Sequence, residues 1–501
     1  MNNFIWIFGE NEGTTMNNNS FFFWRHLLSN SSEEKCYFVV KKNKKKCSTF
    51  QNLPGEFKKK VIFKNSLKHT LIYKKADMFF VTHSYKDVIP NFYFDLTRRI
   101  KKPIIYLQHG TLGIKKMGYT GKSYWNNMFR FLIYNPTIKA HLINEHQFKD
   151  YQLHFAGIHP RYKKLVELNE VMQENKQILW FITWREYFGE NEETKLFAQS
   201  VKKVKEDLRL INYLENEDKS LKICLHHFTP EDVASSISTS SKTKKITVVQ
   251  SSQIDLIEEI ANSSRLITDY SSLGFDFTFL KKPVLIYQFD QDRYVGGRDL
   301  YCHLFEDFIE INCKNIKELI DKIISEDNEL NPFFVKRLNP CYDFELVKNG
   351  YHIDLMYEHF SLVQKNMITI LDCGNISQKK ILDLAEKFLI KGYLVELIIL
   401  DGIWPLNCPP GLNIRFIFKN KSKNPVEFIR YKLLSKSRYY TINLLKKFIK
   451  YSKSKTIIVS DNKFDAILLN AKNNHILNKM KFADLSNENL ERLFPNLKGE
   501  C

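Results

Sequence analysis

The chain has 501 residues, of which 44% are hydrophobic and 14% aromatic, so it can form a packed core and wholesale disorder is excluded. At this length two or three domains are expected. The formal net charge of +19 indicates an anionic partner, which is a nucleic acid, an anionic membrane surface or a phosphate-bearing substrate.

The cysteine pattern and the chain start indicate the compartment. The nine cysteines form no CxxC pair and show no metal-ligand spacing, which is typical of a reducing environment. The first residues, Met1–Gly9, lack the basic start of a signal peptide, and no run of about 18 apolar residues predicts a membrane-spanning helix. We expect a cytoplasmic protein. The lysine-rich stretches Lys41–Lys46 and Lys446–Lys455 are interpreted as solvated faces, or alternatively as attachment sites for an anionic leaflet.

Two series of strands and helices follow one another along the first 365 residues. The first series predicts strands at Phe4–Phe8, Tyr37–Val40, Met78–Thr82 and Ile104–Leu107, with a helix at Phe21–Leu28. The second predicts strands at Ile178–Ile182, Leu221–Leu225, Ile246–Val249, Leu266–Thr268 and Val284–Tyr287, and a closing helix at Tyr351–Gln364. Alternation of this kind indicates parallel sheets, so we predict an α/β protein with two Rossmann-like domains that face a cleft.

A third series predicts the first half of another nucleotide-type fold. Its strands are Ile368–Leu371, Leu394–Leu400, Asn413–Phe418 and Thr456–Ser460, with an amphipathic helix at Gln378–Ile390 and a very basic helical region before the last strand. The predicted domains are residues 1–150, 151–365 and 366–501. The last is interpreted as an appended glycosyltransferase-like segment that binds the acceptor or a partner.

The most informative segment runs from Leu266 to Leu280. A strand ends at Asp269, and Ser271 and Ser272 follow where a helix begins, so their hydroxyls are predicted to cap free N–H groups at an end that attracts phosphate. Asp276 lies about one turn into this helix and is predicted to accept from a polyol or sugar hydroxyl. The alternative is a plain helix cap with a solvent-facing carboxylate.

A second segment places a histidine at a strand end. His109 follows the strand that ends at Leu107 and is flanked by Gly110, Thr111, Leu112 and Gly113. Ligands bind at the carboxyl ends of parallel strands, and histidine titrates near neutral pH, which suits removal of a proton from a hydroxyl nucleophile. A structural turn histidine is the alternative.

Smaller groups of residues fit the same cleft. Thr183, Trp184 and Arg185 follow the first strand of the second series and offer a hydroxyl, an aromatic wall and a cation. Arg161 lies just before that strand, and a third strand ends in the pair formed by His226 and His227.

In this order the segments resemble the CDP-glycerol glycerophosphotransferases, the teichoic-acid polymerase family. The resemblance covers roughly residues 1–360, including Phe8-Gly9-Glu10, and is closest over Leu266–Tyr294. It implies a GT-B-type fold, a CDP-polyol donor, a lipid-linked or polymer acceptor, and peripheral attachment to the inner face of the cell membrane. No cofactor, metal ion or nucleic-acid partner is predicted.

The resemblance also implies roles for residues. His109 matches the general base that acts on the acceptor hydroxyl, and His226 matches a second histidine that assists the departure of CMP. The positions matched to substrate binding are Gly110, Thr111, Leu112, Gly113, Arg161, Thr183, Trp184, Arg185, His227, Ser271, Ser272 and Asp276. The chain departs from the family pattern at Leu112, where proline is usual, and at Cys224, where a basic residue is usual, so His226 and His227 both remain candidates.

Two motifs are set aside, and two other functions stay open. Gly118–Ser123 resembles the end of a P-loop, but Lys116 occupies the position of its first glycine. Asp290 and Asp292 resemble a metal-binding pair and are interpreted as structural. The alternative functions are a glycosyltransferase that uses a nucleotide sugar and a catalytically silent membrane-surface scaffold.

Overall fold

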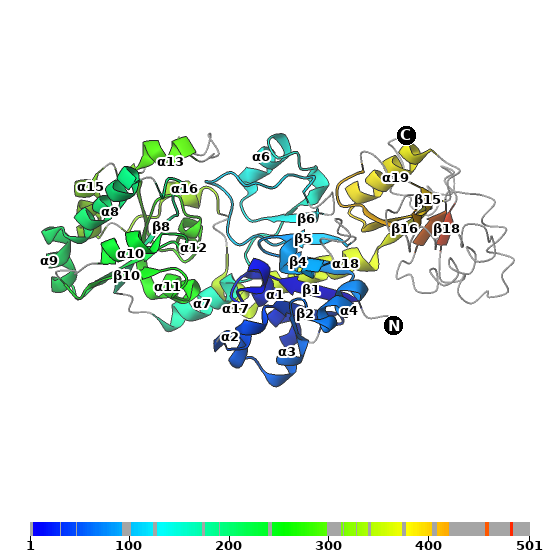
Figure 1. Cartoon of the computed structure of the whole chain (residues 1–501), viewed down its shortest axis with the longest axis horizontal. Coiled ribbons are helices and arrows are strands. Elements are labelled where there is room, and N and C mark those ends of the chain that lie inside the picture. Colours follow the sequence, from blue (N-terminus) through cyan, green and yellow to red (C-terminus); the bar gives the residue numbers. More distant parts are fainter. Residues whose placement is uncertain are drawn as a thin grey trace.

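The computed structural model contains three parallel sheets, each flanked by helices (Figure 1). The structure describes residues 4–30, 32–46, 48–92, 102–123, 128–172, 176–189, 191–238, 243–297, 312–313, 315–326, 328–338, 342–372, 377–402, 408–419, 456–459 and 481–483. The predicted basic helical region before Thr456 and the lysine-rich stretch Lys446–Lys455 lie outside these residues.

The first sheet has seven strands in the order β3-β2-β1-β4-β5-β6-β7, all parallel. The strands are β1 (Ile5–Gly9), β2 (Lys35–Val40), β3 (Val61–Phe63), β4 (Met78–Val81), β5 (Ile104–Tyr106), β6 (Met128–Ile133) and β7 (Leu153–Phe155). The helices are α1 (Asn19–Ser29), α2 (Ser48–Gln51), α3 (Gly55–Lys60), α4 (Leu67–Lys75) and α6 (Lys139–Asn144). The apolar central strands β4 and β6 are buried along their whole length, as expected for a parallel sheet covered on both faces.

The second sheet has six parallel strands in the order β10-β9-β8-β11-β12-β13. The strands are β8 (Gln177–Ile182), β9 (Ser220–Leu225), β10 (Ile246–Gln250), β11 (Ser263–Thr268), β12 (Val284–Tyr287) and β13 (Asn312–Cys313). The helices are α7 (Tyr162–Val171), α8 (Asn191–Lys205), α9 (Leu208–Asn216), α10 (Glu231–Ser238), α11 (Leu256–Asn262), α12 (Leu273–Phe279), α13 (Gln291–Gly297), α15 (Ile316–Ile324), α16 (Pro332–Val335) and α17 (Phe344–Asn349). Both sheets reverse their strand order beside the first strand, which is the Rossmann pattern, so the predicted fold class is confirmed.

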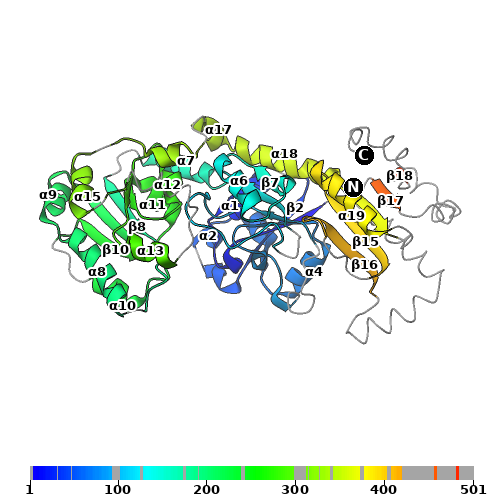
Figure 2. The same cartoon turned by 90° about the horizontal axis from the view of Figure 1, so that it is seen from above.

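Helix α18 (Tyr351–Lys365) leads the chain back from the second sheet to the first. It runs along one side of the molecule from α17 toward the third sheet (Figure 2). Phe360 packs edge-on against Phe80 of β4 with ring centroids 5.4 Å apart, and the indole of Trp6 donates a hydrogen bond to Gln364. The closing helix predicted from the sequence is therefore present, and it packs on the first sheet.

The third sheet has five parallel strands in the order β16-β15-β14-β17-β18. They are β14 (Ile368–Asp372), β15 (Val395–Gly402), β16 (Asn413–Lys419), β17 (Thr456–Val459) and β18 (Lys481–Ala483), with α19 (Gln378–Ile390) after β14. Strand β18 was not predicted; with β17 it lies on the side of β14 opposite to β15. This sheet shares a buried apolar cluster with the first sheet, and the hydroxyl of Tyr151 donates to the carbonyl of Pro410 at 3.1 Å.

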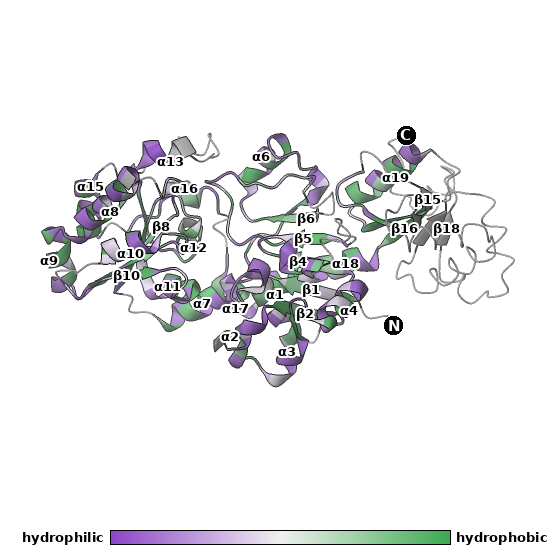
Figure 3. Ribbon diagram, in the orientation of Figure 1, coloured by the Kyte–Doolittle hydropathy of each residue, from purple (hydrophilic) through white to green (hydrophobic). Residues whose placement is uncertain are grey.

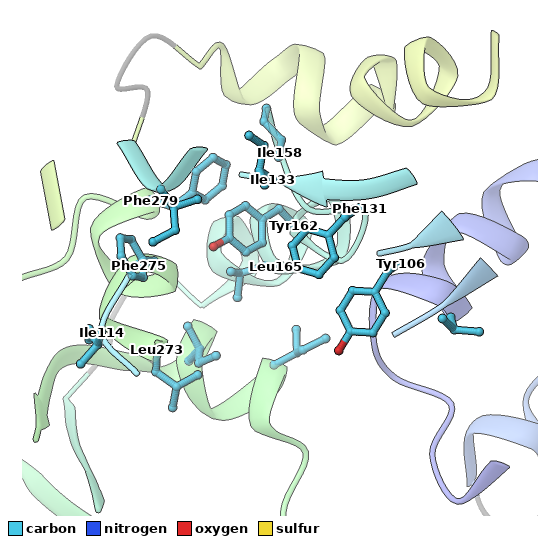
Figure 4. Close-up of a cluster of buried hydrophobic side chains, with 14 of the residues drawn as sticks. Tyr106, Ile114, Phe131, Ile133, Ile158, Tyr162, Leu165, Leu273, Phe275 and Phe279 are labelled. Carbon is cyan, nitrogen blue, oxygen red and sulfur yellow. The ribbon is translucent and has the colours of Figure 1, made fainter. Parts of the chain in front are cut away.

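The hydrophobic residues follow this layering, with apolar strands inside and polar helix faces outside (Figure 3). One apolar cluster joins the first two sheets through α7 (Figure 4). It brings Tyr106 and Phe131 of the first sheet into one core with Tyr162 of α7 and with Phe275 and Phe279 of α12. The division into residues 1–150, 151–365 and 366–501 stays a prediction.

Candidate active site between the first and second sheets

The loop after β5 meets the start of α12. Gln108 turns the chain sharply at the strand end, because its backbone takes a positive φ of 57°. A side-chain carbon placed at Gly110 would lie 2.7 Å from Oγ of Ser272, and one placed at Gly113 would lie 2.9 Å from the ring of Phe275. A larger residue at either position would force the neighbouring side chain to move. The structure therefore brings the two segments predicted to carry the chemistry into contact.

The rest of this loop is tied to its own domain. The carbonyl of Leu112 accepts a hydrogen bond from Nδ2 of Asn135 at 3.0 Å. The loop is thus anchored to Asn135 through its backbone at position 112.

His109 lies between the carboxyl ends of two strands. One of its ring nitrogens donates a hydrogen bond to the backbone of Thr82, and its ring stacks on His83 with centroids 5.0 Å apart. Desolvation by the surrounding protein lowers the pKa of His109, and His83 and Arg161 lower it further, although the side chain keeps an exposed surface. A neutral imidazole with one nitrogen donating has its other nitrogen free to accept a proton.

Arg161 at the start of α7 and Asp276 of α12 form a buried ion pair. Nη2 of Arg161 lies 2.5 Å from Oδ1 of Asp276, and the Tyr162 hydroxyl donates to the same oxygen at 2.5 Å. Asp276 is 1% exposed, which excludes the solvent-facing alternative. Among the described residues, Oδ2 of Asp276 and Nε of Arg161 have no hydrogen-bond partner.

A buried histidine connects the same segment to the loop after β5. Nε2 of His159 lies 2.9 Å from Oγ1 of Thr111, and its Nδ1 lies 2.9 Å from Nδ2 of Asn19 at the start of α1. The ring also stacks on Tyr134, with centroids 3.6 Å apart. The predicted substrate residue Thr111 is therefore buried and held by His159.

Thr183 and Arg185 are bonded to other residues of the second domain. Arg185 is 0% exposed; its guanidinium binds Asp290 through two hydrogen bonds of 2.6 and 2.9 Å and lies 2.8 Å from Asp269. Its Nη1 also donates to the hydroxyl of Thr183 at 2.8 Å. Both side chains are thus buried and bonded to protein groups, and these bonds hold the carboxyl ends of β8 and β11 together. Their contact with a substrate stays a prediction. Asp290 is structural, as interpreted from the sequence.

The two serines before α12 differ in role. Oγ of Ser271 accepts a hydrogen bond from the backbone N–H of Leu273 at 3.2 Å, so it caps the helix. Ser272 precedes the first helical residue but makes no side-chain cap. Its hydroxyl instead faces Gly110 across the domain boundary, at the contact described above.

An aromatic cluster follows strands β8 and β9. Trp184 meets Phe228 edge-on with centroids 6.2 Å apart, and His226 stacks on His227 at 4.2 Å. Nδ1 of His226 accepts from the backbone N–H of Phe228 at 3.2 Å, which leaves the proton of a neutral ring on Nε2. His227 is more exposed and lies 3.4 Å from Oγ of Ser251.

Four residues of this region were missed as candidates from the sequence: His83, His159, Asp269 and Glu10. His83, Asp269 and Glu10 each follow a strand of the two Rossmann sheets within two residues, a position that the sequence does reveal. Glu10 accepts hydrogen bonds from three backbone N–H groups before and within α1, yet burial raises its pKa to about 7. His159 shows no such positional pattern, because only the folded chain brings it to Thr111.

The described part of the chain contains no group of three or more histidine, cysteine or acidic residues able to hold a metal ion. It also contains no helix both long and apolar enough to cross a bilayer.

Comparison with known proteins agrees with this geometry. The model of the family described as CDP-glycerol:poly(glycerophosphate) glycerophosphotransferase matches residues 2–343. The teichoic acid ribitol-phosphate polymerase TarK of Staphylococcus aureus is 28% identical over 132 residues, which are 26% of this chain and 25% of TarK. The minor teichoic acid biosynthesis protein GgaB of Bacillus subtilis is 24% identical over 285 residues, covering 53% of this chain and 30% of GgaB. The chain thus matches less than a third of the length of these relatives.

A solved structure supports the fold. The wall teichoic acid polymerase TagF superposes with a TM-score of 0.52 at 18% identity, over 72% of this chain and 89% of that chain. At this identity the likeness shows a shared fold.

Proposed function

The chain belongs to the CDP-glycerol:poly(glycerophosphate) glycerophosphotransferase family, and from this premise we propose that it transfers a polyol-phosphate group from a CDP-polyol to a hydroxyl of a growing cell-surface polymer. The observation that carries the proposal is the contact between the His109 loop of the first sheet and the Ser272 end of α12. It brings a neutral base and a helix start together, as a phosphoryl transfer between two bound substrates requires.

The proposed reaction begins at the acceptor. The acceptor hydroxyl oxygen attacks the β-phosphorus of the donor while its proton passes to the free nitrogen of His109. The bond between the β-phosphorus and the bridging oxygen breaks, and CMP leaves with the electron pair. A positioned general base contributes about 10²–10⁴-fold to the rate of such a step.

Histidine 226 suits the leaving-group side of this reaction. Its Nδ1 accepts from the backbone of Phe228, which places the proton of a neutral ring on Nε2. In the proposed reaction this N–H donates to a phosphate oxygen of the departing CMP. In this reaction His109 accepts the proton of the acceptor hydroxyl, and His226 donates a hydrogen bond to the leaving group. For this reason we propose His226, and not His227, as the histidine on the leaving-group side.

The buried pair of Arg161 and Asp276 also fits a ligand site. One nitrogen of the guanidinium and one oxygen of the carboxylate lack partners within the described residues, and a polyol hydroxyl can both accept from the first and donate to the second. The proposed polyol site therefore lies beside this pair.

A membrane surface is proposed as a further partner, supported by α4. Its residues Leu67 and Leu71 are 75% and 49% exposed, and Lys68, Lys74 and Lys75 lie on the same short helix. Exposed leucines among lysines favour an anionic bilayer, where each lysine near the surface is worth about 1 kcal/mol. Replacing both leucines with serine should reduce binding to vesicles containing anionic lipid, whereas Leu208→Ser on α9, 63% exposed, should not. Equal binding by both variants would refute this partner.

The experiment that tests the reaction compares two histidine variants. Wild type and His141→Asn, a change on the exterior helix α6, should release CMP from a CDP-polyol when an acceptor is present. His109→Asn should lose at least 100-fold in rate while keeping its thermal stability. Full activity in His109→Asn would overturn the assignment, and turnover of a nucleotide sugar instead would favour a glycosyltransferase.

A further inference from the structure

A cavity lies where the chain crosses between the first two domains. Its volume is about 290 Å³, just below the ~300–1,000 Å³ typical of ligand pockets. The walls come from the last turns of α1, the start of α7 and the junction of α17 with α18. Both crossings, one into the second sheet and one back from it, therefore border the same cavity.

The lining combines an apolar floor with a basic, hydrogen-bonding rim. Pro160 and Ile353 are buried, and the rim carries Arg25, Lys163 and Lys164. Amide and hydroxyl groups of Ser29, Asn30 and Asn349 complete it.

The charge of the rim is positive. Three cations face one lining carboxylate, Glu167, which lies 3.2 Å from Nζ of Lys163 and 3.9 Å from Nζ of Lys164. The described residues give Arg25 no ion-pair partner. Arginine binds phosphate through two parallel hydrogen bonds, which makes Arg25 a phosphate-binding group.

The part of the cavity wall formed by the junction of α17 and α18 is packed against α1. Gly350 joins α17 to α18 with a positive φ of 85°, and a side-chain carbon there would lie 2.4 Å from the ring of His26. That ring lines the cavity and lies 2.7 Å from Asp354 of α18. The return crossing is thus fixed against α1.

The other side of the wall connects to the active site. Lys163 and Lys164 lie two and three residues after Arg161, which pairs with Asp276. Two residues before Arg161 lies His159, which holds Thr111 of the His109 loop. A ligand that draws the start of α7 toward Arg25 therefore moves the segment that contains Arg161 and His159. These residues contact Asp276 and Thr111 of the active site.

We propose that this cavity is a second binding site for a polyol phosphate, separate from the cleft that contains His109, and that its occupation changes the transfer rate. The phosphate binds Arg25 and Lys164, and the polyol carbons lie on the apolar floor. The ligand is either a free small molecule or one repeat of the polymer. The effect on rate rests on the proposed function; the binding does not.

The test is calorimetric titration of the full chain without donor, using inorganic phosphate, glycerol 3-phosphate and a short oligo(glycerol phosphate). Arg25→Ala/Lys164→Ala should bind glycerol 3-phosphate at least tenfold more weakly, and Lys195→Ala on α8 should bind it as wild type does. Tighter binding of the oligomer than of the monomer identifies a polymer repeat, and equal binding identifies a free ligand.

Several results would overturn the proposal. These are no heat with any of the three probes, unchanged binding by the double variant, or inorganic phosphate binding as tightly as glycerol 3-phosphate. Transfer assays at saturating donor then show whether glycerol 3-phosphate changes the rate of wild type but not of the double variant. If the binding result holds and no transfer occurs at all, the proposed function fails while the second site stands.

Discussion

Removing the carboxylate of Asp276 tests whether this residue binds a substrate hydroxyl or stabilises the fold through Arg161. The sequence predicts that it accepts from a substrate hydroxyl, whereas the structure commits one of its oxygens to Arg161 and Tyr162. Asp276→Ala leaves a buried guanidinium without its counter-ion, which typically costs about 3–5 kcal/mol, and deprives the Tyr162 hydroxyl of an acceptor, which costs about 1–3 kcal/mol. These costs overlap, so we expect a loss of about 4 kcal/mol in the free energy of unfolding.

A double-mutant cycle in denaturant measures the coupling between the two side chains. Asp276→Ala and Arg161→Ala should each be strongly destabilising, and the double variant should lose less than the sum of the two. Directly contacting residues typically couple by about 0.5–3 kcal/mol, and independent sites add within about 0.3–0.5 kcal/mol. Additive losses, or a single loss below about 1 kcal/mol, would refute the reasoning. An Asp276→Asn variant with wild-type stability and a raised KM would instead assign the residue to substrate binding alone.

Three further predictions concern single positions. Gly110→Ala places a carbon 2.7 Å from the Ser272 hydroxyl, so CMP release should fall at least tenfold, and an unchanged rate would contradict this contact. Gly350→Ala should cost more unfolding free energy than Gly392→Ala, because both have positive φ but only the first meets an imidazole at 2.4 Å; equal losses in urea would contradict the clash. Burial lowers the pKa of His69 to about 4, so only the unfolded chain binds its proton between pH 6.5 and 4. Stability should therefore be complete above pH 6.5 and fall as the pH drops, by up to ~3 kcal/mol from this residue. His69→Gln should flatten the decline of the urea midpoint between pH 7.5 and 5.

The central strands were predictable because each is a continuous apolar run. The edge strands β3, β7 and β13 were not, because each has only two or three residues. Strand β6 escaped prediction for another reason. Arg130 interrupts its apolar sequence, yet the guanidinium is buried against the ring of Phe129, 4.0 Å from its centroid.

The sequence showed which candidate site residues follow strands, but it did not show which of them contact one another. Ser272 and Gly110, which follows His109, are far apart in sequence, and only the packing of two domains makes them neighbours. The burial of Thr183 and Arg185 was not predictable, because a position after a strand does not reveal whether a side chain is buried. Their partners Asp269 and Asp290 occupy similar strand-end positions, and only the folded chain shows that these charges satisfy one another.

The most direct test of the central claim is a ³¹P NMR time course of a CDP-polyol with the full chain and a defined acceptor. We expect CMP and a new phosphodiester signal to appear together, only when the acceptor is present, and neither to appear with His109→Asn. Acceptor-independent loss of donor, or product formed equally by His109→Asn, would contradict the account.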